Sequence, residues 1–200
     1  MKKIELGVKN ILSSGVFCLI LSSLAFAADT FQVDPTHSSI GFAVQHLVVS
    51  TTKGEFTNYQ ATIRFDSKNP KATEFDIVIQ AASIDTRVKQ RDDHLKTSDF
   101  LDVENHPTIT FKSKEVKKEG SQLLIKGDLT IRGVTKEITV PTVVSGPVVS
   151  PFGSTVIGVS GQFTLNRQDF GVSWNKQMDQ GGYVVGDQVT IDVHFEAAKQ

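Results

Sequence analysis

The sequence has almost no cysteine. Cys18 is the single cysteine among 200 residues, and it lies in an apolar segment near the N-terminus. Without that segment the chain excludes disulfides, thiolate nucleophiles and cysteine metal ligands. Its core must then be held by packing alone, which is feasible because a chain of this size buries roughly 70% of its unfolded surface.

The sequence also lacks an excess of charge of either sign. Its 21 basic and 22 acidic residues give a formal net charge of −1. The richest basic stretch, residues 112–120, contains two acids and ends in glycine, which is typical of the end of a hairpin. Proteins that bind nucleic acids concentrate lysine and arginine on one face. We therefore expect no nucleic-acid partner.

The first 27 residues have the three parts of a secretory signal peptide. Lys2, Lys3 and Lys9 precede an apolar run that ends in Ala25-Phe26-Ala27, a small-x-small cleavage pattern. We predict a signal peptide over 1–27, one domain over 28–200, and a periplasmic or secreted protein without a stable membrane span after cleavage. The alternative is a retained anchor, which requires the four serines of the run to be tolerated.

The rest of the chain alternates between apolar and polar residues with the period of a β-strand. This pattern covers residues 38–47, 61–66, 74–81, 107–113, 122–133, 160–168 and 188–196. Turn sequences separate many of these segments, which favours an antiparallel meander. Closure of such a sheet removes both edges and covers the apolar face. The fold class predicted is all-β, an eight-stranded antiparallel lipocalin-like barrel.

The apolar face of these segments is rich in phenylalanine and isoleucine. It also contains small residues at Ala61, Gly127 and Gly161, which leave space on an inward face. A barrel of about eight strands holds either packed side chains or one small ligand. The pattern alone permits both a filled core and a ligand cavity.

One long segment lacks the alternation. Residues 85–104 contain few β-branched residues, and opposite charges stand four apart, as in Lys89 and Asp93. Asp85 is a candidate N-cap. We predict a short helical excursion over about 85–104 at one mouth of the barrel.

The stretch 91–106, "RDDHLKTSDFLDVENH", is crowded with acids and histidines. Read as a catalytic site, it places His94 and Ser98 one helical turn apart, but it contains no nucleophile-elbow motif. Read as a metal site, it lacks the H-E-x-x-H and EF-hand patterns. The interpretation we favour is that these charges solvate and fasten the helical excursion, with Arg91 suited to an anionic head group. We predict no catalytic residues, no metal and no cofactor.

Several stretches resemble the YceI-like family of bacterial polyisoprenoid-binding proteins. The most specific is R-D-x-H-L…D-F-L-D followed by P-T-I-T-F-K-S, within residues 83–113. Further matching stretches are 37–47, 54–56, 127–140, 167–172 and 186–197. The resemblance implies an eight-stranded barrel with helices near one mouth and a hydrophobic lumen for a long-chain amphiphile. It implies a periplasmic or secreted location and no accepted catalytic activity.

We therefore predict a non-enzymatic monomer or homodimer that binds, carries or sequesters a polyisoprenoid, quinone-like or fatty-acyl molecule. The candidate ligand-binding residues are Ile40, Phe42, Val44, His46, Ile63, Phe65, Ile77, Ile79, Arg91, His94, Phe111, Leu129, Phe163, Phe170 and Trp174. One alternative is an enzyme acting on such a lipid through His46, Asp92, His94 or His106. Another is a filled barrel with an interaction surface.

Overall fold

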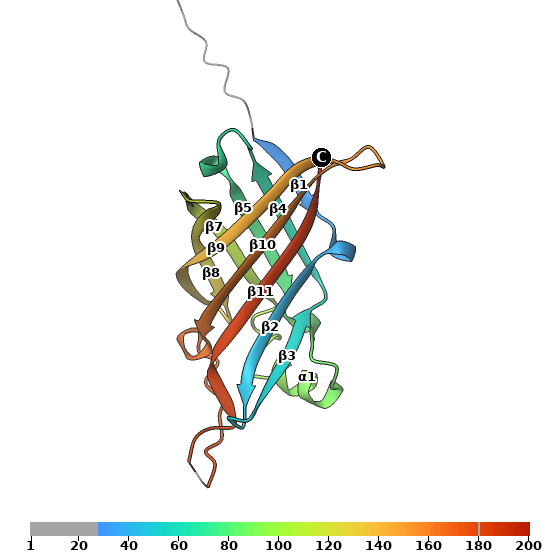
Figure 1. The fold of residues 1–200 in the computed structure, drawn as a ribbon. Helices are drawn as coiled ribbons and strands as arrows, with labels where there is room; N and C mark the ends of the chain where they lie inside the picture. The colour runs from blue at the N-terminus through green and yellow to red at the C-terminus, as the bar shows by residue number, and fades with distance from the viewer. Residues whose placement is uncertain (1–27, 180) are drawn as a thin grey trace, which may run out of the picture.

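The computed structural model describes residues 28–179 and 181–200, so the predicted signal peptide lies outside it. A single antiparallel sheet winds into a barrel (Figure 1). The strands are β1 Asp29–Val33, β2 Ser39–His46, β3 Ser50–Phe56, β4 Tyr59–Phe65, β5 Glu74–Gln80, β6 Ile84–Asp85, β7 Thr108–Glu119, β8 Gln122–Ile131, β9 Val134–Val149, β10 Thr155–Asn166 and β11 Val185–Lys199. The helices are α1 Lys89–Lys96 and the 3₁₀ turns η1 Pro35–His37, η2 Pro70–Ala72, η3 Ala81–Ser83 and η4 Arg167–Phe170.

Closure of the barrel depends on β1. This strand pairs with β4 on one side, where Phe31 faces Ile63, and with β11 on the other, where Phe31 faces Lys199. The ring thus runs β1-β4-β5-β7-β8-β9-β10-β11 and returns to β1. Beyond η1, β2 takes the place of β1 alongside β11, and β3 and β6 extend the wall. The predicted eight-stranded antiparallel barrel is confirmed.

The two ends of the barrel are filled differently. Around β1, the side chains of Phe31, Ile63 and Ile157 are almost completely inaccessible to solvent and pack with Val33 and Ala197. Toward α1, several inward-facing residues keep accessible surface although they point into the barrel; they are Ile77, Phe111, Phe163, Ile191 and Val193. One end is therefore a packed core and the other is hollow.

The predicted helical excursion is present but is shorter than expected. Its α-helix spans Lys89–Lys96, and Lys89 Nζ pairs with Asp93 Oδ2 at 2.7 Å. The prediction that Asp85 caps it is wrong. Val88 occupies the N-cap position without a side-chain cap, and Asp85 Oδ1 instead accepts a hydrogen bond from the Arg87 N–H at 2.6 Å. The turn that this carboxylate closes delays the start of the helix.

Glycine at position 127 makes room for an aromatic ring rather than for empty space. A Cβ atom there would lie 2.5 Å from the Lys112 carbonyl oxygen and 2.7 Å from the Phe111 ring. The Phe111 ring lies across the glycine and forms part of the lumen wall. The expectation that Gly127 leaves space in the lumen is wrong because this ring occupies the space. Ala61 is buried outside the cavity lining, and Gly161 does line the cavity.

We expect Gly127→Ala to lower the free energy of unfolding by about 2 kcal/mol, because the added methyl group overpacks a site bounded by backbone. Chemical denaturation measures the effect. Gly158→Ala in β10 is the matched control, since a Cβ atom there meets only Ser145 Cβ at 3.8 Å. Equal stability of the two variants would contradict the steric argument.

Candidate binding cavity

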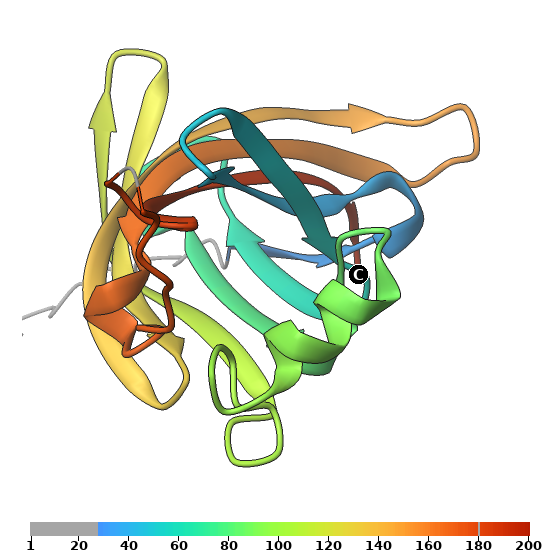
Figure 2. The ribbon, with the colours of Figure 1, turned by 90° about the horizontal axis from the view of Figure 1, so that it is seen from below.

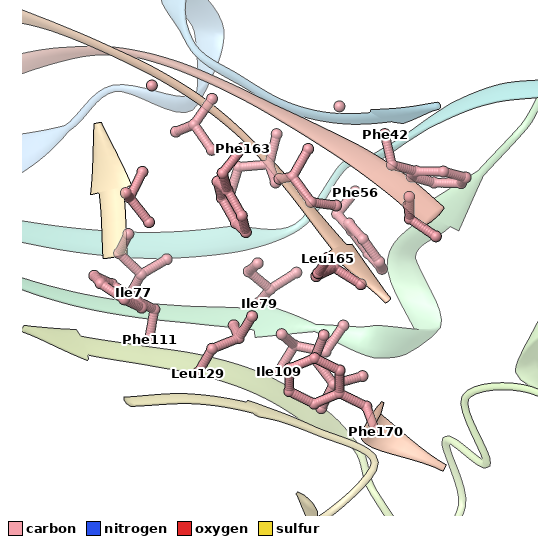
Figure 3. Close-up of a pocket in the computed structure, with 18 of the residues that line it drawn as sticks. Phe42, Phe56, Ile77, Ile79, Ile109, Phe111, Leu129, Phe163, Leu165 and Phe170 are labelled. Atoms are coloured by element: carbon pink, nitrogen blue, oxygen red, sulfur yellow. The ribbon is translucent and has the colours of Figure 1, made fainter. Parts of the chain in front are cut away.

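The hollow end of the barrel contains an internal cavity of about 220 Å³. Its walls come from β2, β3, β5, β6, β7, β8, β9, β10 and β11, so nearly every side of the barrel contributes (Figure 3). Phenylalanine side chains line it from well-separated parts of the chain, and Phe42, Phe56, Phe111, Phe163 and Phe170 are labelled in the close-up. The alternation of each strand explains the arrangement, because every second residue points inward.

The lining is almost entirely apolar. Within the part of the chain that the structure describes, Thr142 and Arg167 are the lining residues with polar side chains. The Thr142 hydroxyl donates to the Val140 carbonyl at 3.1 Å. The Arg167 guanidinium donates to the Val172 carbonyl at 2.6 Å and to the Gly186 carbonyl at 2.9 Å. Both side chains are thus bonded to the protein, and the space is suited to an apolar guest.

The first cover over the hollow end consists of α1 and the turns that follow it, residues 89–103. Leu95, Phe100 and Leu101 line the cavity from this segment. Asp92, within α1, is buried, and its Oδ1 accepts a hydrogen bond from the Thr86 N–H at 2.8 Å. Arg91 Nη2 donates to the Thr86 carbonyl at 2.8 Å. Arg91 and Asp92 thus fasten the cover to the chain before it.

The second cover is the segment from η4 to β11, and Arg167 is its anchor. This arginine is 5% exposed, and its Nη1 also donates to the Trp174 carbonyl at 3.0 Å. Burial lowers the pKa of the Arg167 guanidinium, and the neighbouring Asp187 carboxylate offsets part of that shift. The Arg167 side chain therefore links the two ends of residues 172–186, because it bonds to Val172 and Trp174 near one end and to Gly186 at the other.

The two covers are joined by an aromatic cluster. The Trp174 ring lies 5.1 Å from the His94 ring and 5.2 Å from the Phe100 ring, between ring centroids. Arg132, in the turn between β8 and β9, donates hydrogen bonds to the Ser98 carbonyl and the Gly171 carbonyl. Figure 2 looks into this end of the barrel, with α1 and η4 at its rim. We call the His94, Phe100 and Trp174 cluster the mouth clasp.

We expect Trp174→Ala to loosen the first cover. Each aromatic contact contributes about 0.5–1.5 kcal/mol, so loss of two should raise amide exchange in that cover by about tenfold or more. The informative amides are those of Leu101 and Val103, which donate to the Leu95 and Lys96 carbonyls. Hydrogen-exchange mass spectrometry measures them. Trp174→Phe serves as the control that keeps a ring, and unchanged protection in Trp174→Ala would rule out the clasp.

The structure places nine of the fifteen predicted ligand-binding residues in the cavity wall. These are Ile40, Phe42, Val44, Ile77, Ile79, Phe111, Leu129, Phe163 and Phe170. Their contact with a ligand stays a prediction.

Six of the predicted residues lie outside the cavity lining. Ile63 and Phe65 are inward but belong to the packed end, because their strand pairs with β1 there. His46 ends β2 at the turn, beyond the cavity. The remaining three are in the covers: Arg91 turns to Thr86, and His94 and Trp174 form the clasp.

Two residues of the enzymatic alternative, Asp92 and His94, form hydrogen bonds with neighbouring residues. The His94 Nε2 lies 2.8 Å from Asp99 Oδ2, and the Asp92 carboxylate is bonded to Thr86. His106 packs against Gly133, at the turn between β8 and β9. Among residues 28–179 and 181–200, no group of three or more histidine, cysteine or acidic side chains is placed to hold a metal ion.

Several lining residues were missed by the sequence reasoning. Leu95, Phe100, Leu101, Val172 and Val185 belong to the covers, which do not follow strand alternation. In residues 136–142, "KEITVPT", the period-two pattern places Val140 and Thr142 on the same inward face, but Pro141 between them obscured that pattern. No helix in the described part of the chain is both long enough and apolar enough to cross a bilayer.

Comparison with known proteins agrees with this architecture. The YceI-like domain model matches residues 31–197. A "UPF0312 protein" of Pseudomonas aeruginosa is 38% identical over 165 residues, which are 82% of this chain and 84% of that protein.

Two solved structures share the fold. The crystal structure of Burkholderia cenocepacia BcnA has a TM-score of 0.73 at 25% identity, covering 82% of this chain and 98% of that one. A polyisoprenoid binding domain from Saccharophagus degradans has a TM-score of 0.64 at 13% identity, covering 86% and 99%, and at that identity it shows the fold alone. With the family model matching most of its length, the chain belongs to the YceI-like domain family.

Proposed function

We propose that the mature protein binds and sequesters a long-chain amphiphile, such as a polyisoprenoid, a quinone-like molecule or a fatty-acid derivative. The observation that carries the proposal is the apolar cavity of about 220 Å³ at one end of the barrel. The name of the Saccharophagus degradans domain, which is a structural neighbour, supports the polyisoprenoid as one candidate. Binding buries the chain of the ligand, and its polar head stays at the clasp end, where Arg91 and His94 lie.

The energetics set a requirement on chain length. Each methylene moved from water into an apolar site contributes about 0.8 kcal/mol, which is about fourfold in Kd. Association itself costs on the order of 4–15 kcal/mol in lost freedom. Four buried methylenes contribute about 3 kcal/mol, which is below the whole range of that cost, whereas ten contribute about 8 kcal/mol and exceed its lower part. We expect affinity to rise with chain length until the cavity is full.

We propose binding rather than catalysis because two of the groups that an enzyme would use, Asp92 and His94, are hydrogen-bonded within the first cover. The Asp92 carboxylate accepts a hydrogen bond from Thr86. The His94 ring is hydrogen-bonded to Asp99 and contacts the rings of the mouth clasp. The sequence of residues 1–27 supports action in the periplasm or outside the cell. The oligomeric state that we propose is a monomer or homodimer.

Mass spectrometry of organic extracts from purified mature protein tests the proposal directly. Titrations with fluorescent octanoyl, dodecanoyl, hexadecanoyl and polyprenyl probes should show Kd falling as the chain lengthens. A clean extract, together with no uptake of any probe, would refute the binding function. Turnover of a bound probe that is lost in His94→Ala, with affinity unchanged, would favour the enzyme instead.

A further inference from the structure

An apolar tip projects from the clasp end of the barrel. The turn between β2 and β3 exposes Leu47, Val48 and Val49 to 40%, 59% and 85%, and Tyr183 beside it is 57% exposed. We call these four residues the mouth tip. Figure 1 shows the β2–β3 turn and the segment before β11 extending together below the barrel. They are adjacent, because the Leu47 N–H donates to the Val184 carbonyl at 2.9 Å.

The residues of this turn are poorly suited to its backbone. Leu47 and Val48 both have positive φ, 51° and 64°, and the Val49 N–H donates to the His46 carbonyl at 3.2 Å. A turn with two positive φ values favours asparagine and glycine, and a β-branched residue is an outlier there. The turn between β8 and β9 follows the rule better, with Arg132 and Gly133 at its centre. The apolar side chains of the mouth tip thus oppose local preference and gain little burial within the chain.

Several backbone groups of the mouth tip are nevertheless hydrogen-bonded. Gln45 Nε2 donates to the Val48 carbonyl at 3.2 Å, and Gly182 packs against Val48. Tyr183 forms an isolated antiparallel bridge with Gln177. Entry into an apolar phase is costly for unpaired backbone groups, and these bonds reduce that cost. The tip therefore presents its side chains on a backbone that is bonded at several points.

The size and place of the mouth tip indicate what it contacts. Four side chains at a convex tip fall far short of the roughly 1,000 Å² that a stable protein interface buries. Shallow insertion into a bilayer needs only a few apolar groups at the boundary of the head groups. The tip is also next to the cavity. Val44, which lines the cavity, is three residues before Leu47, and Val185, which also lines it, is two residues after Tyr183.

We propose that the mouth tip inserts into the head-group boundary of a phospholipid bilayer and holds the open end of the barrel against it. The residues that flank the turn, Gln45, His46, Ser50 and Thr51, include no carboxylate, lysine or arginine. The segment before Tyr183 exposes one charge of each sign, at Lys176 and Asp179. Attachment is therefore by apolar insertion rather than by a net charge. This inference goes beyond cavity binding, and bilayer attachment is measurable without any ligand.

Flotation of the mature protein, residues 28–200, with phosphatidylcholine vesicles provides the test. The triple variant V48S/V49S/Y183S should lower the vesicle-bound fraction by about tenfold or more, since it removes most of the exposed apolar surface of the tip. The control is V149S/F152S in the β9–β10 hairpin, at the opposite end of the barrel, where these residues are 74% and 95% exposed. The control should bind vesicles as the wild type does.

Three results would overturn the proposal: a wild-type protein that does not float, an equal loss in V149S/F152S, or a concentration-dependent dimer that the triple variant abolishes. Circular dichroism verifies folding of each variant. If the triple variant does not fold, Val49→Asp replaces it, because Val49 is the most exposed side chain of the tip. Val49→Asp should also abolish flotation, and vesicle binding at the wild-type level would overturn the proposal. Affinity of each variant for a fluorescent acyl probe keeps failure of the tip distinct from failure of the cavity.

Discussion

Ile191→Trp is expected to abolish binding of long-chain probes while the barrel stays folded. Ile191 lies at mid-length in β11, between Phe163 on β10 and Phe42 on β2, and all three line the cavity. An indole ring there occupies the space that the ligand chain would fill. Displacing about four methylenes costs about 3 kcal/mol, which raises Kd more than a hundredfold.

The stability of this variant is as informative as its affinity. A filled core would be overpacked by the larger ring and lose about 1–3 kcal/mol, whereas a hollow one accommodates it. We therefore expect a melting temperature close to that of the wild type, measured by circular dichroism. Thr190→Trp is the matched control, because Thr190 is adjacent on β11 and faces away from the cavity. Probe binding that survives in Ile191→Trp would show that ligands do not use this cavity.

Arg167→Met is expected to be the most destabilising of the substitutions considered. The methionine fills part of the space but leaves the carbonyls of Val172, Trp174 and Gly186 without their donor. A fully buried acceptor that loses its partner costs about 1–3 kcal/mol. The hydrogen bond to Val172 is buried and those to Trp174 and Gly186 are partly buried, so we expect a total of about 3–5 kcal/mol. For a domain of this size that corresponds to a fall of about 10 °C in melting temperature.

Arg64→Met is the control for Arg167→Met. Arg64 pairs with Glu74 on the outer surface, where both side chains are more than half exposed. Surface ion pairs contribute about 0–1 kcal/mol, so its melting temperature should barely change. If Arg167→Met and Arg64→Met have the same melting temperature, the second cover is not anchored by the buried guanidinium.

The sequence predicted those strands whose two faces have different surroundings. β4 alternates cleanly, since Ala61, Ile63 and Phe65 are buried and Gln60 and Arg64 are exposed. The strands β1, β3, β6 and β9 were missed. β1 is five residues long, and β3 carries polar residues on both faces because it extends the wall beyond the closed ring. In β9, Pro141 argued against a strand, although the long pairing with β8 accommodates it opposite Leu124.

The candidate site was predictable as a set of walls but not as a volume. Alternation identifies Phe111 and Ile63 alike as inward, yet one lines the cavity and the other is in the packed end. That difference depends on where β1 closes the barrel, which is a long-range property. The mouth clasp likewise joins His94 to Trp174, 80 positions apart in the chain, and no local pattern connects them.

The buried side chains of Phe31, Ile63 and Ile157 close the lumen at the β1 end, so a ligand of the proposed kind enters and leaves at the clasp end. A molecule that enters chain first must leave head first by the same route. A second ligand cannot enter until the first has left. Ligand exchange is therefore dissociative, and we expect its rate to be independent of the concentration of the competing ligand. For the function that we propose, the cavity must therefore release one ligand before it binds the next.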